Sequence, residues 1–254
     1  MILALDVGNT NIEIGCMDGK TIRFTERFST DLRKTDLEYA MLIKTIMEIH
    51  GVGEKEIEGT IIASVVPPLT HILKEALRKL MDTDPLVVGA GIKTGLNIRM
   101  DNPASIGSDL IVGSVEAMDS YGAPLTIIDM GTATTMAVID KDGVYSGGVI
   151  MPGVNMTLKA LSSQTAQLPL VSLGAPKKYI GKNTIDAMKS GIIYGEAAML
   201  DGMIDRFEEE LGYETKHVAT GGLSGVIIPH CRHEITMDPV LTLNGLRLIY
   251  DKNR

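Results

Sequence analysis

The sequence has few cysteines, no long apolar run and no cluster of basic residues, and each shortage excludes a class of protein. Cys16 and Cys231 are the only cysteines among 254 residues. Two cysteines are too few for a disulfide framework, so we expect a reducing compartment, the cytoplasm. No apolar run approaches the roughly 20 residues that a membrane-spanning helix needs, so no membrane partner is expected.

Positive charge is also scarce. Lys and Arg number 24 against 32 Asp and Glu, which gives a formal net charge of −8. Nucleic acids and anionic membranes attract basic surfaces, so neither is expected as the main partner. Phosphate ligands stay compatible with this composition, because backbone amides and a metal ion bind them without a basic surface.

Several motifs of common enzymes are missing. The chain has no Gly-x-Ser-x-Gly elbow and no His-Glu-x-x-His, so hydrolase interpretations have little support. Residues 89–95 resemble a P-loop, but Ile92 separates the Gly from the Lys, and we interpret them as a structured loop. His230, Cys231 and His233 lack a second ligand pair, so a surface loop is favoured over a metal site.

Strands and helices alternate along the chain. Residues 60–66 predict a buried strand, which Pro67 ends. Thr35 and Glu38 form a capping box that begins a helix ending near residue 51. Alternation of this kind predicts an α/β layer architecture. Five apolar residues recur near helical spacing and are assigned to the inner face of that helix: Leu37, Ala40, Met41, Ile43 and Met47.

One pattern occurs twice. Residues 6–10 (DVGNT) and 129–133 (DMGTA) each follow an apolar strand, and each leads into a second strand that ends at an Asp-Gly turn. Two such hairpins can look alike by chance, but the shared Asp, Gly and downstream turn favour duplication of one unit. We therefore predict two lobes, residues 1–118 and 119–254.

The two hairpins suit a phosphate site. Glycine lets the backbone approach a ligand closely, and successive amides in a turn form an anion-binding nest. A carboxylate beside phosphates is repulsive unless a cation is present, so Asp6 is assigned to Mg²⁺. The plain alternative is that Asp6 and Asp129 only cap their turns. Two matched turns, together with Gly221 and Gly222, favour the phosphate interpretation.

Seven short motifs then identify a family. They are DVGNTN (6–11), SVVPP (64–68), GIKTGL (91–96), GTATT (131–135), GGVI (147–150), GKNT (181–184) and TGGL (220–223). With these motifs in this order, the chain resembles the type III pantothenate kinases of the actin/hexokinase-like superfamily over essentially its whole length. The resemblance implies a duplicated ribonuclease-H-like fold of the actin-like ATPase kind, with ATP in the interlobe cleft, and a homodimer.

The resemblance also implies an activity and a nucleotide site. ATP would phosphorylate the primary hydroxyl of pantothenate to 4′-phosphopantothenate, the first step of coenzyme A biosynthesis. Asp6 would bind Mg²⁺, and Asp129 would help to bind a monovalent cation, K⁺ or NH₄⁺. The residues that would contact ATP are Asp6, Val7, Gly8, Asn9, Thr10, Asn11, Ile12, Glu13, Thr132, Gly221 and Gly222.

The acceptor side matches the family less well. Asp109 matches the catalytic base of the family's Gly-x-Asp-Arg motif, although without the resemblance we would interpret it as a first-turn helix residue. The implied substrate-binding positions are Met100, Gly107, Ser108, Asp109, Leu110 and Thr184, with Thr184 reaching pantothenate across the dimer interface. Leu110 stands where the family has Arg, and Met100 where it has Tyr.

The two departures leave three interpretations open. Arg99 or another basic group compensates, or the acceptor is a different small alcohol, or the chain is a paralogue with weak or no kinase activity. A nucleotide-binding regulatory protein is the non-enzymatic form of the last interpretation. The retained Asp6, Asp109, Asp129 and Thr184 speak against it.

Overall fold

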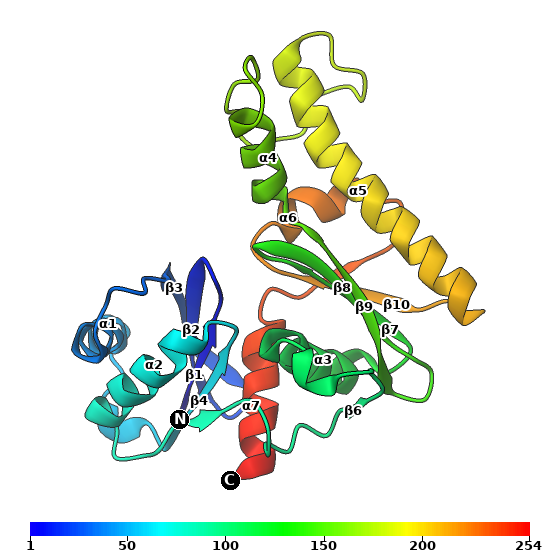
Figure 1. The fold of residues 1–254 in the computed structure, drawn as a ribbon. Coiled ribbons are helices and arrows are strands. Elements are labelled where there is room, and N and C mark those ends of the chain that lie inside the picture. The colour runs from blue at the N-terminus through cyan, green and yellow to red at the C-terminus, as the bar shows by residue number, and fades with distance from the viewer. The chain divides into compact units, whose positions relative to one another are not determined.

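A computed structural model describes residues 1–254, and these residues form two compact units (Figure 1). The first contains residues 1–96, 101–116 and 240–254, and the second contains residues 97–100 and 117–239. The division at 118/119 stays a prediction about the duplicated halves. The compact units are divided at other positions, because the C-terminal helix packs on the first sheet and so belongs to the first unit. None of the helices is both long and apolar enough to span a bilayer.

The first unit is built on a five-stranded sheet with the order β3-β2-β1-β4-β5. Strands β1 to β3 form an antiparallel meander, whereas β4 runs parallel to β1 and β5 parallel to β4. The strand bounds are β1 Ile2–Val7, β2 Asn11–Asp18, β3 Thr21–Ser29, β4 Gly59–Ser64 and β5 Leu86–Val87.

Helices cover both faces of this sheet. Leu3 and Leu5 of β1 pack toward α1 and α2, while Ile2 and Ala4 pack toward α7. This follows because successive side chains of a strand point to opposite faces, and a strand buried on both faces is apolar throughout. The helix bounds are α1 Asp36–Ile49, α2 Pro67–Leu80 and α7 Leu241–Asn253, with short 3-10 helices at Glu54–Glu56 and Pro103–Ser105.

Helix α1 confirms one prediction and corrects another. The Thr35 hydroxyl accepts from the Glu38 amide at 3.3 Å, and the Glu38 carboxylate accepts from the Thr35 amide at 2.7 Å, which is the predicted capping box. The assigned apolar face is wrong in two places, because Leu37 and Met41 are exposed. Tyr39 is buried instead, because α1 meets the sheet and α2 along a stripe centred on Tyr39 and Ile43.

The second unit is built on a six-stranded sheet with the order β11-β10-β7-β8-β9-β6. Its core joins Ile128 and Met130 of β7 to Ile193, Leu200 and Ile204 of the long helix α5. The strands are β6 Asn97–Ile98, β7 Leu125–Met130, β8 Ala133–Ile139, β9 Val144–Pro152, β10 Lys216–Thr220 and β11 Thr236–Met237. The helices are α4 Val154–Ser163, α5 Thr184–Leu211, α6 Ser224–Ile227 and a 3-10 turn at Ile228–His230, while α3, Ser108–Tyr121, begins in the first unit and ends in the second.

The two sheets repeat one arrangement. The order β3-β2-β1-β4 recurs as β9-β8-β7-β10, with the same antiparallel meander and the same parallel fourth strand. Each copy also has a register shift in its second strand, at Cys16/Met17 and at Val138/Ile139. The predicted α/β fold made of a duplicated unit is therefore confirmed.

Candidate functional site

The first hairpin presents an exposed turn between β1 and β2. The Gly8 amide donates to the Asn11 carbonyl oxygen at 3.0 Å, and Asn9, Thr10 and Asn11 are exposed. Val7 and Ile12, which were assigned to ATP, are fully buried in the core. Their side chains therefore pack in the core, and the Val7 carbonyl oxygen accepts from the Val65 amide at 3.1 Å.

Two carboxylates stand beside this turn. Asp6 and Glu13 are direct partners in the β1–β2 ladder, so their side chains leave the same face of the sheet. The Glu13 carboxylate binds the Arg27 guanidinium, with 3.1 Å between Oε2 and Nη2. Hard cations such as Mg²⁺ prefer carboxylate oxygens, so Asp6 has the chemistry that its assignment requires.

The second hairpin lies against the turn that follows β10. Thr220 pairs with Asp129 in the β7–β10 ladder, so the next residue, Gly221, approaches Asp129. A Cβ atom at Gly221 would lie 2.7 Å from Asp129 Oδ1 and 2.6 Å from the Met130 carbonyl carbon. Gly221 also has φ +92°, which side chains rarely adopt. The structure thus brings together two predicted residues, and only glycine fits there.

Helix α4 begins against the same hairpin. Gly153 precedes α4, and a Cβ atom there would collide with the carbonyl oxygen of Thr132 and lie 3.0 Å from that of Gly131. The Gly131–Thr132 turn itself is exposed. The first amides of α4 are thereby held close to the turn, and such amides attract anions. Gly153 was not predicted, because its role appears only when α4 packs on the turn.

Asp109 occupies the first turn of α3. The Leu110 amide donates to Asp109 Oδ1 at 2.8 Å. A Cβ atom at Gly107 would collide with Asp109 Oδ1 and lie 3.4 Å from a methyl carbon of Val65, so two family motifs meet here. Burial raises the pKa of Asp109, and the hydrogen bond from the Leu110 amide opposes this shift. The neighbouring Ser108 hydroxyl is buried without a hydrogen-bond partner.

Met100, which stands where the family has Tyr, lies beside a glycine of β9. A Cβ atom at Gly147 would lie 3.4 Å from Met100 Sδ, and Gly147 has φ +129°. The preceding Arg99 is exposed, and its Nη1 atom lies 3.9 Å from Asp140 Oδ2. Arg99 therefore already has an acidic neighbour, which weakens its case as the compensating group.

Thr184 is the first residue of α5 and is exposed. Asn183 caps this helix, because its Oδ1 atom accepts from the Asp186 amide at 2.9 Å. Gly181 is pressed against the main chain of Ala187, where a Cβ atom would collide. The GKNT motif therefore forms a compact helix start that presents Thr184 at the surface.

Gly222, the other glycine of the turn after β10, is exposed next to Gly221.

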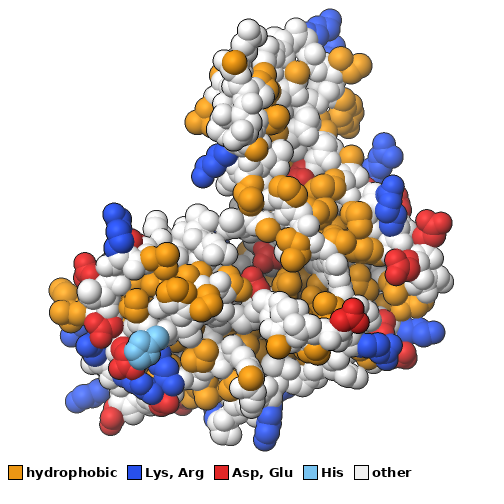
Figure 2. Space-filling view, in the orientation of Figure 1, with side chains coloured by type: hydrophobic (Ala, Val, Ile, Leu, Met, Phe, Trp, Pro, Cys, Tyr) orange, Lys and Arg blue, Asp and Glu red, His pale blue; other side chains and the backbone are white.

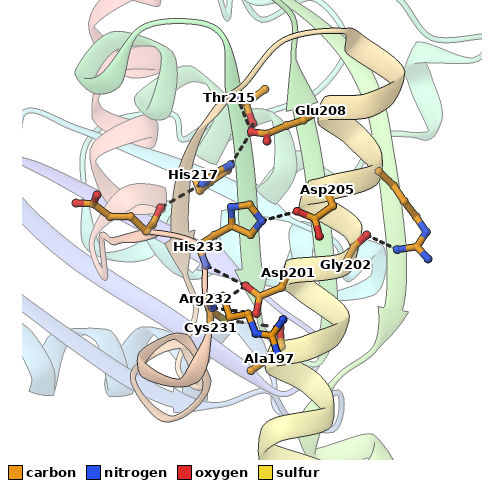
Figure 3. A network of polar contacts seen from close by, with 12 residues as sticks. Ala197, Asp201, Gly202, Asp205, Glu208, Thr215, His217, Cys231, Arg232 and His233 are labelled. Atoms are coloured by element: carbon orange, nitrogen blue, oxygen red, sulfur yellow. Dashed lines mark hydrogen bonds and ion pairs between the residues drawn. The ribbon is translucent and has the colours of Figure 1, made fainter.

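The segment around His233 forms a polar network with α5 (Figure 3). The buried Asp201 carboxylate accepts from the amides of Arg232 and His233, at 2.9 and 3.2 Å. His233 Nε2 lies 2.8 Å from Asp205 Oδ1. Burial raises the pKa of the Cys231 thiol to about 12, and the nearby Asp201 adds to the shift. These groups hold the segment to α5, and the thiol stays protonated and unreactive.

Comparisons with known proteins bear on the whole chain. The model of the family described as type III pantothenate kinase matches residues 2–206. A protein of Moorella thermoacetica named type III pantothenate kinase is 43% identical over 253 residues, and one of an Exiguobacterium species with the same name is 44% identical over 254 residues. Both alignments cover 100% of this chain and 100% of the relative.

Two solved structures share the fold at low sequence identity. A conserved putative Baf family transcriptional activator from Campylobacter jejuni has a TM-score of 0.62 and 18% identity, covering 99% of this chain and 98% of that chain. The ROK hexokinase from Thermus thermophilus has a TM-score of 0.50 and 10% identity, covering 100% and 99%. At such identities the likeness concerns the fold alone. The family match and the full-length relatives show that the chain belongs to the type III pantothenate kinase family.

Proposed function

We propose that this protein is an ATP-dependent pantothenate kinase, which transfers the γ-phosphoryl group of ATP to the primary hydroxyl of pantothenate. The observation that carries the proposal is the 43–44% identity to type III pantothenate kinases over the full length. The product would be 4′-phosphopantothenate, which opens coenzyme A biosynthesis. The cytoplasm is the proposed compartment, because a chain with only two cysteines suits a reducing environment.

The residues of the first hairpin are proposed to bind the phosphates. Asn9 and Thr10 are exposed, and the main-chain amides of such a turn suit phosphate oxygens, while Asp6 would hold Mg²⁺. Asp129, close to Gly221, would help to hold K⁺ or NH₄⁺. A bound cation neutralises charge on the phosphates, which is a main source of rate in phosphoryl transfer.

Asp109 is proposed as the general base. Its carboxylate would accept the proton of the pantothenate hydroxyl as the oxygen bonds to the γ-phosphorus and ADP leaves. Burial raises its pKa, which makes the carboxylate a better proton acceptor than an exposed one. Gly107 allows Asp109 to fold back over the main chain, because no side chain fits between them.

The acceptor side favours a second candidate within the same chemistry. Leu110 and Met100 supply no charge and no strong hydrogen-bond donor, although pantothenate is an acid. Losing a hydrogen bond to a charged group costs about 1.5–3 kcal/mol, roughly ten- to a hundredfold in affinity. A kinase for an uncharged small alcohol is therefore the alternative.

A coupled ADP-release assay with Mg²⁺ and K⁺ separates these candidates. We would compare the native chain with the Met100→Tyr/Leu110→Arg double variant, using pantothenate and its uncharged amide as acceptors. Turnover of the native chain at micromolar pantothenate supports the main proposal. Turnover of pantothenate only by the double variant supports the alternative acceptor. If neither protein transfers phosphate while ATP still binds, the kinase assignment fails.

We also propose that the protein is a homodimer and that Thr184 reaches pantothenate bound to the partner subunit. Three large apolar side chains near Thr184 are exposed: Tyr179, Ile180 and Ile185. Hydrophobic side chains also reach the surface around α4 and the neighbouring part of α5 (Figure 2). Light scattering should give twice the chain mass of 27.3 kDa, and Ile180→Asp should shift the mass toward the monomer.

A further inference from the structure

We propose that Thr30 is a positioning residue that orients the turn of the first hairpin for ATP. The inference rests on the proposed role of that turn in phosphate binding. Thr30 directly follows β3, the strand that pairs with β2. It lies outside the motifs that carry the family resemblance.

Thr30 makes two hydrogen bonds to the turn. Its hydroxyl donates to the Gly8 carbonyl oxygen at 2.6 Å, and its amide donates to the Thr10 carbonyl oxygen at 3.0 Å. The two carbonyls belong to the peptide units before Asn9 and after Thr10. One residue thereby holds two of the three peptide units that make up the turn.

The hydrogen bond to Gly8 determines where one amide points. A trans peptide is planar, and its C=O and N–H point in opposite directions. The Gly8 carbonyl points toward Thr30, so the amide of Asn9 points away from Thr30 and away from β3. Asn9 itself is exposed, and an amide held in this orientation in an exposed turn can donate to a phosphate oxygen.

Without this bond the Gly8–Asn9 peptide is less constrained. Glycine allows a wide range of backbone angles, so rotation of that peptide unit costs little. A rotated peptide presents its carbonyl oxygen where the amide stood, and an oxygen repels a phosphate. The hydroxyl of Thr30 therefore acts on ATP affinity through the turn, without touching the nucleotide.

The main chain of Asp31, the residue after Thr30, is held by the buried hydroxyl of Tyr39. Tyr39 of α1 is fully buried, and its hydroxyl accepts from the Asp31 amide at 3.0 Å and donates to the Asp31 carbonyl at 2.9 Å. The Arg33 guanidinium also binds the Asp31 carboxylate and, with the Arg33 amide, lowers its pKa to about 2. The residue after Thr30 is thus held on its main chain and on its side chain.

The test is a comparison of four variants by steady-state kinetics and by calorimetric titration with ATP. Thr30→Val keeps the shape and removes the hydroxyl, so we expect the KM and the Kd for ATP to rise about three- to tenfold. The KM for pantothenate should stay within about twofold. Thr30→Ser restores the hydroxyl and should restore ATP affinity to within about twofold of the native chain. Tyr39→Phe should weaken ATP binding in the same direction by a smaller factor.

Thr25→Val is the matched control, because Thr25 is an exposed threonine of β3, the strand that Thr30 follows, and lies away from the turn. It should leave both KM values unchanged. The proposal is overturned if Thr30→Val lowers the melting temperature but leaves the Kd for ATP unchanged, or if Thr30→Ser fails to restore binding. If Thr30→Val does not fold, an unchanged Kd for ATP in Tyr39→Phe overturns it.

The result is distinguishable from failure of the proposed function. A native chain that binds ATP in a Thr30-dependent manner but does not phosphorylate pantothenate supports the positioning role while the acceptor assignment fails. A native chain that binds no ATP overturns both.

Discussion

The carboxylate of Asp129 and the main chain of Gly221 are in such close contact that a Cβ atom at Gly221 would lie 2.7 Å from Asp129 Oδ1. The contact joins the end of β7 to the end of β10, where Thr220 and Asp129 are ladder partners. It places one of the two duplicated aspartates beside the glycine turn that the family resemblance assigns to ATP. Position 221 requires glycine for two reasons: a side chain would clash with its neighbours, and the main chain has a positive φ.

We therefore expect Gly221→Ala to damage the protein. A methyl group would meet the Met130 main chain at 2.6 Å and force a side chain into φ +92°. Overpacking of this kind costs about 1–3 kcal/mol, so the free energy of unfolding should fall by about that amount, and ATP affinity should fall with it. Urea denaturation and ATP titration measure both. Gly225→Ala is the control, because that position is open, and equal effects of the two variants would contradict the prediction.

The contact between Gly153 and the Gly131–Thr132 turn gives a second prediction. Gly153→Ala places a methyl group where the Thr132 carbonyl oxygen now lies, so the turn must move away from the start of α4. We expect the Kd for ATP to rise, with a loss of stability of about 1–3 kcal/mol. Gly174→Ala, at a loop position with open space, should change neither quantity. An unchanged Kd for ATP in Gly153→Ala would show that the turn does not contribute to binding.

The proposed base leads to a third prediction. Asp109→Asn keeps the size of the side chain and removes its ability to accept a proton, so kcat should fall by about 10²- to 10⁴-fold while the Kd for ATP is retained. In the native chain, kcat/KM for pantothenate should fall as the pH drops through the raised pKa of Asp109, because only the ionised carboxylate accepts a proton. Loss of ATP binding in the variant would instead assign Asp109 a structural role.

Asp109 also makes stability depend on pH. Because burial raises its pKa in the folded state, folding favours the protonated form. Its contribution to stability is complete below the ordinary carboxylate pKa and is lost as the pH rises through the folded-state pKa. The Asp109→Asn variant has no carboxyl group to ionise and so does not lose this stability. Its melting temperature should therefore exceed that of the native chain at neutral pH, and the difference should become smaller as the pH is lowered. A constant or negative difference in melting temperature would contradict this account.

The network in Figure 3 supplies a prediction about stability alone. Asp201→Ala leaves the amides of Arg232 and His233 without their carboxylate acceptor. Hydrogen bonds to a charged group contribute about 1.5–3 kcal/mol, so the free energy of unfolding should fall by that amount. Asp205→Ala is the control: its carboxylate is 68% exposed, and its ion pair with His233 should contribute less than about 1 kcal/mol. Urea denaturation should therefore show a larger loss of unfolding free energy for Asp201→Ala than for Asp205→Ala.

Local patterns in the sequence determined much of the fold. The capping box at Thr35 and Glu38 predicted where α1 begins, since both partners lie within one helical turn. The repeated Asp-x-Gly hairpins predicted the duplicated sheet, because strand, turn and return strand are contiguous in the chain. The same local reasoning failed for the inner face of α1, where Leu37 and Met41 are exposed and Tyr39 is buried. Apolar spacing does not say how a helix is rotated against its neighbours.

Only the tertiary structure decided which residues meet. Thr30 lies 22 residues from Gly8, and the bond between them exists because β3 pairs with β2 in one register. Gly221 reaches Asp129 because β10 adds to β7 in parallel, and Gly153 reaches Thr132 because β9 returns to the same turn. These contacts depend on strand order and register, which no short stretch of sequence encodes. The sequence thus determined the parts of the candidate site, and the sheet topology decided how those parts hold one another.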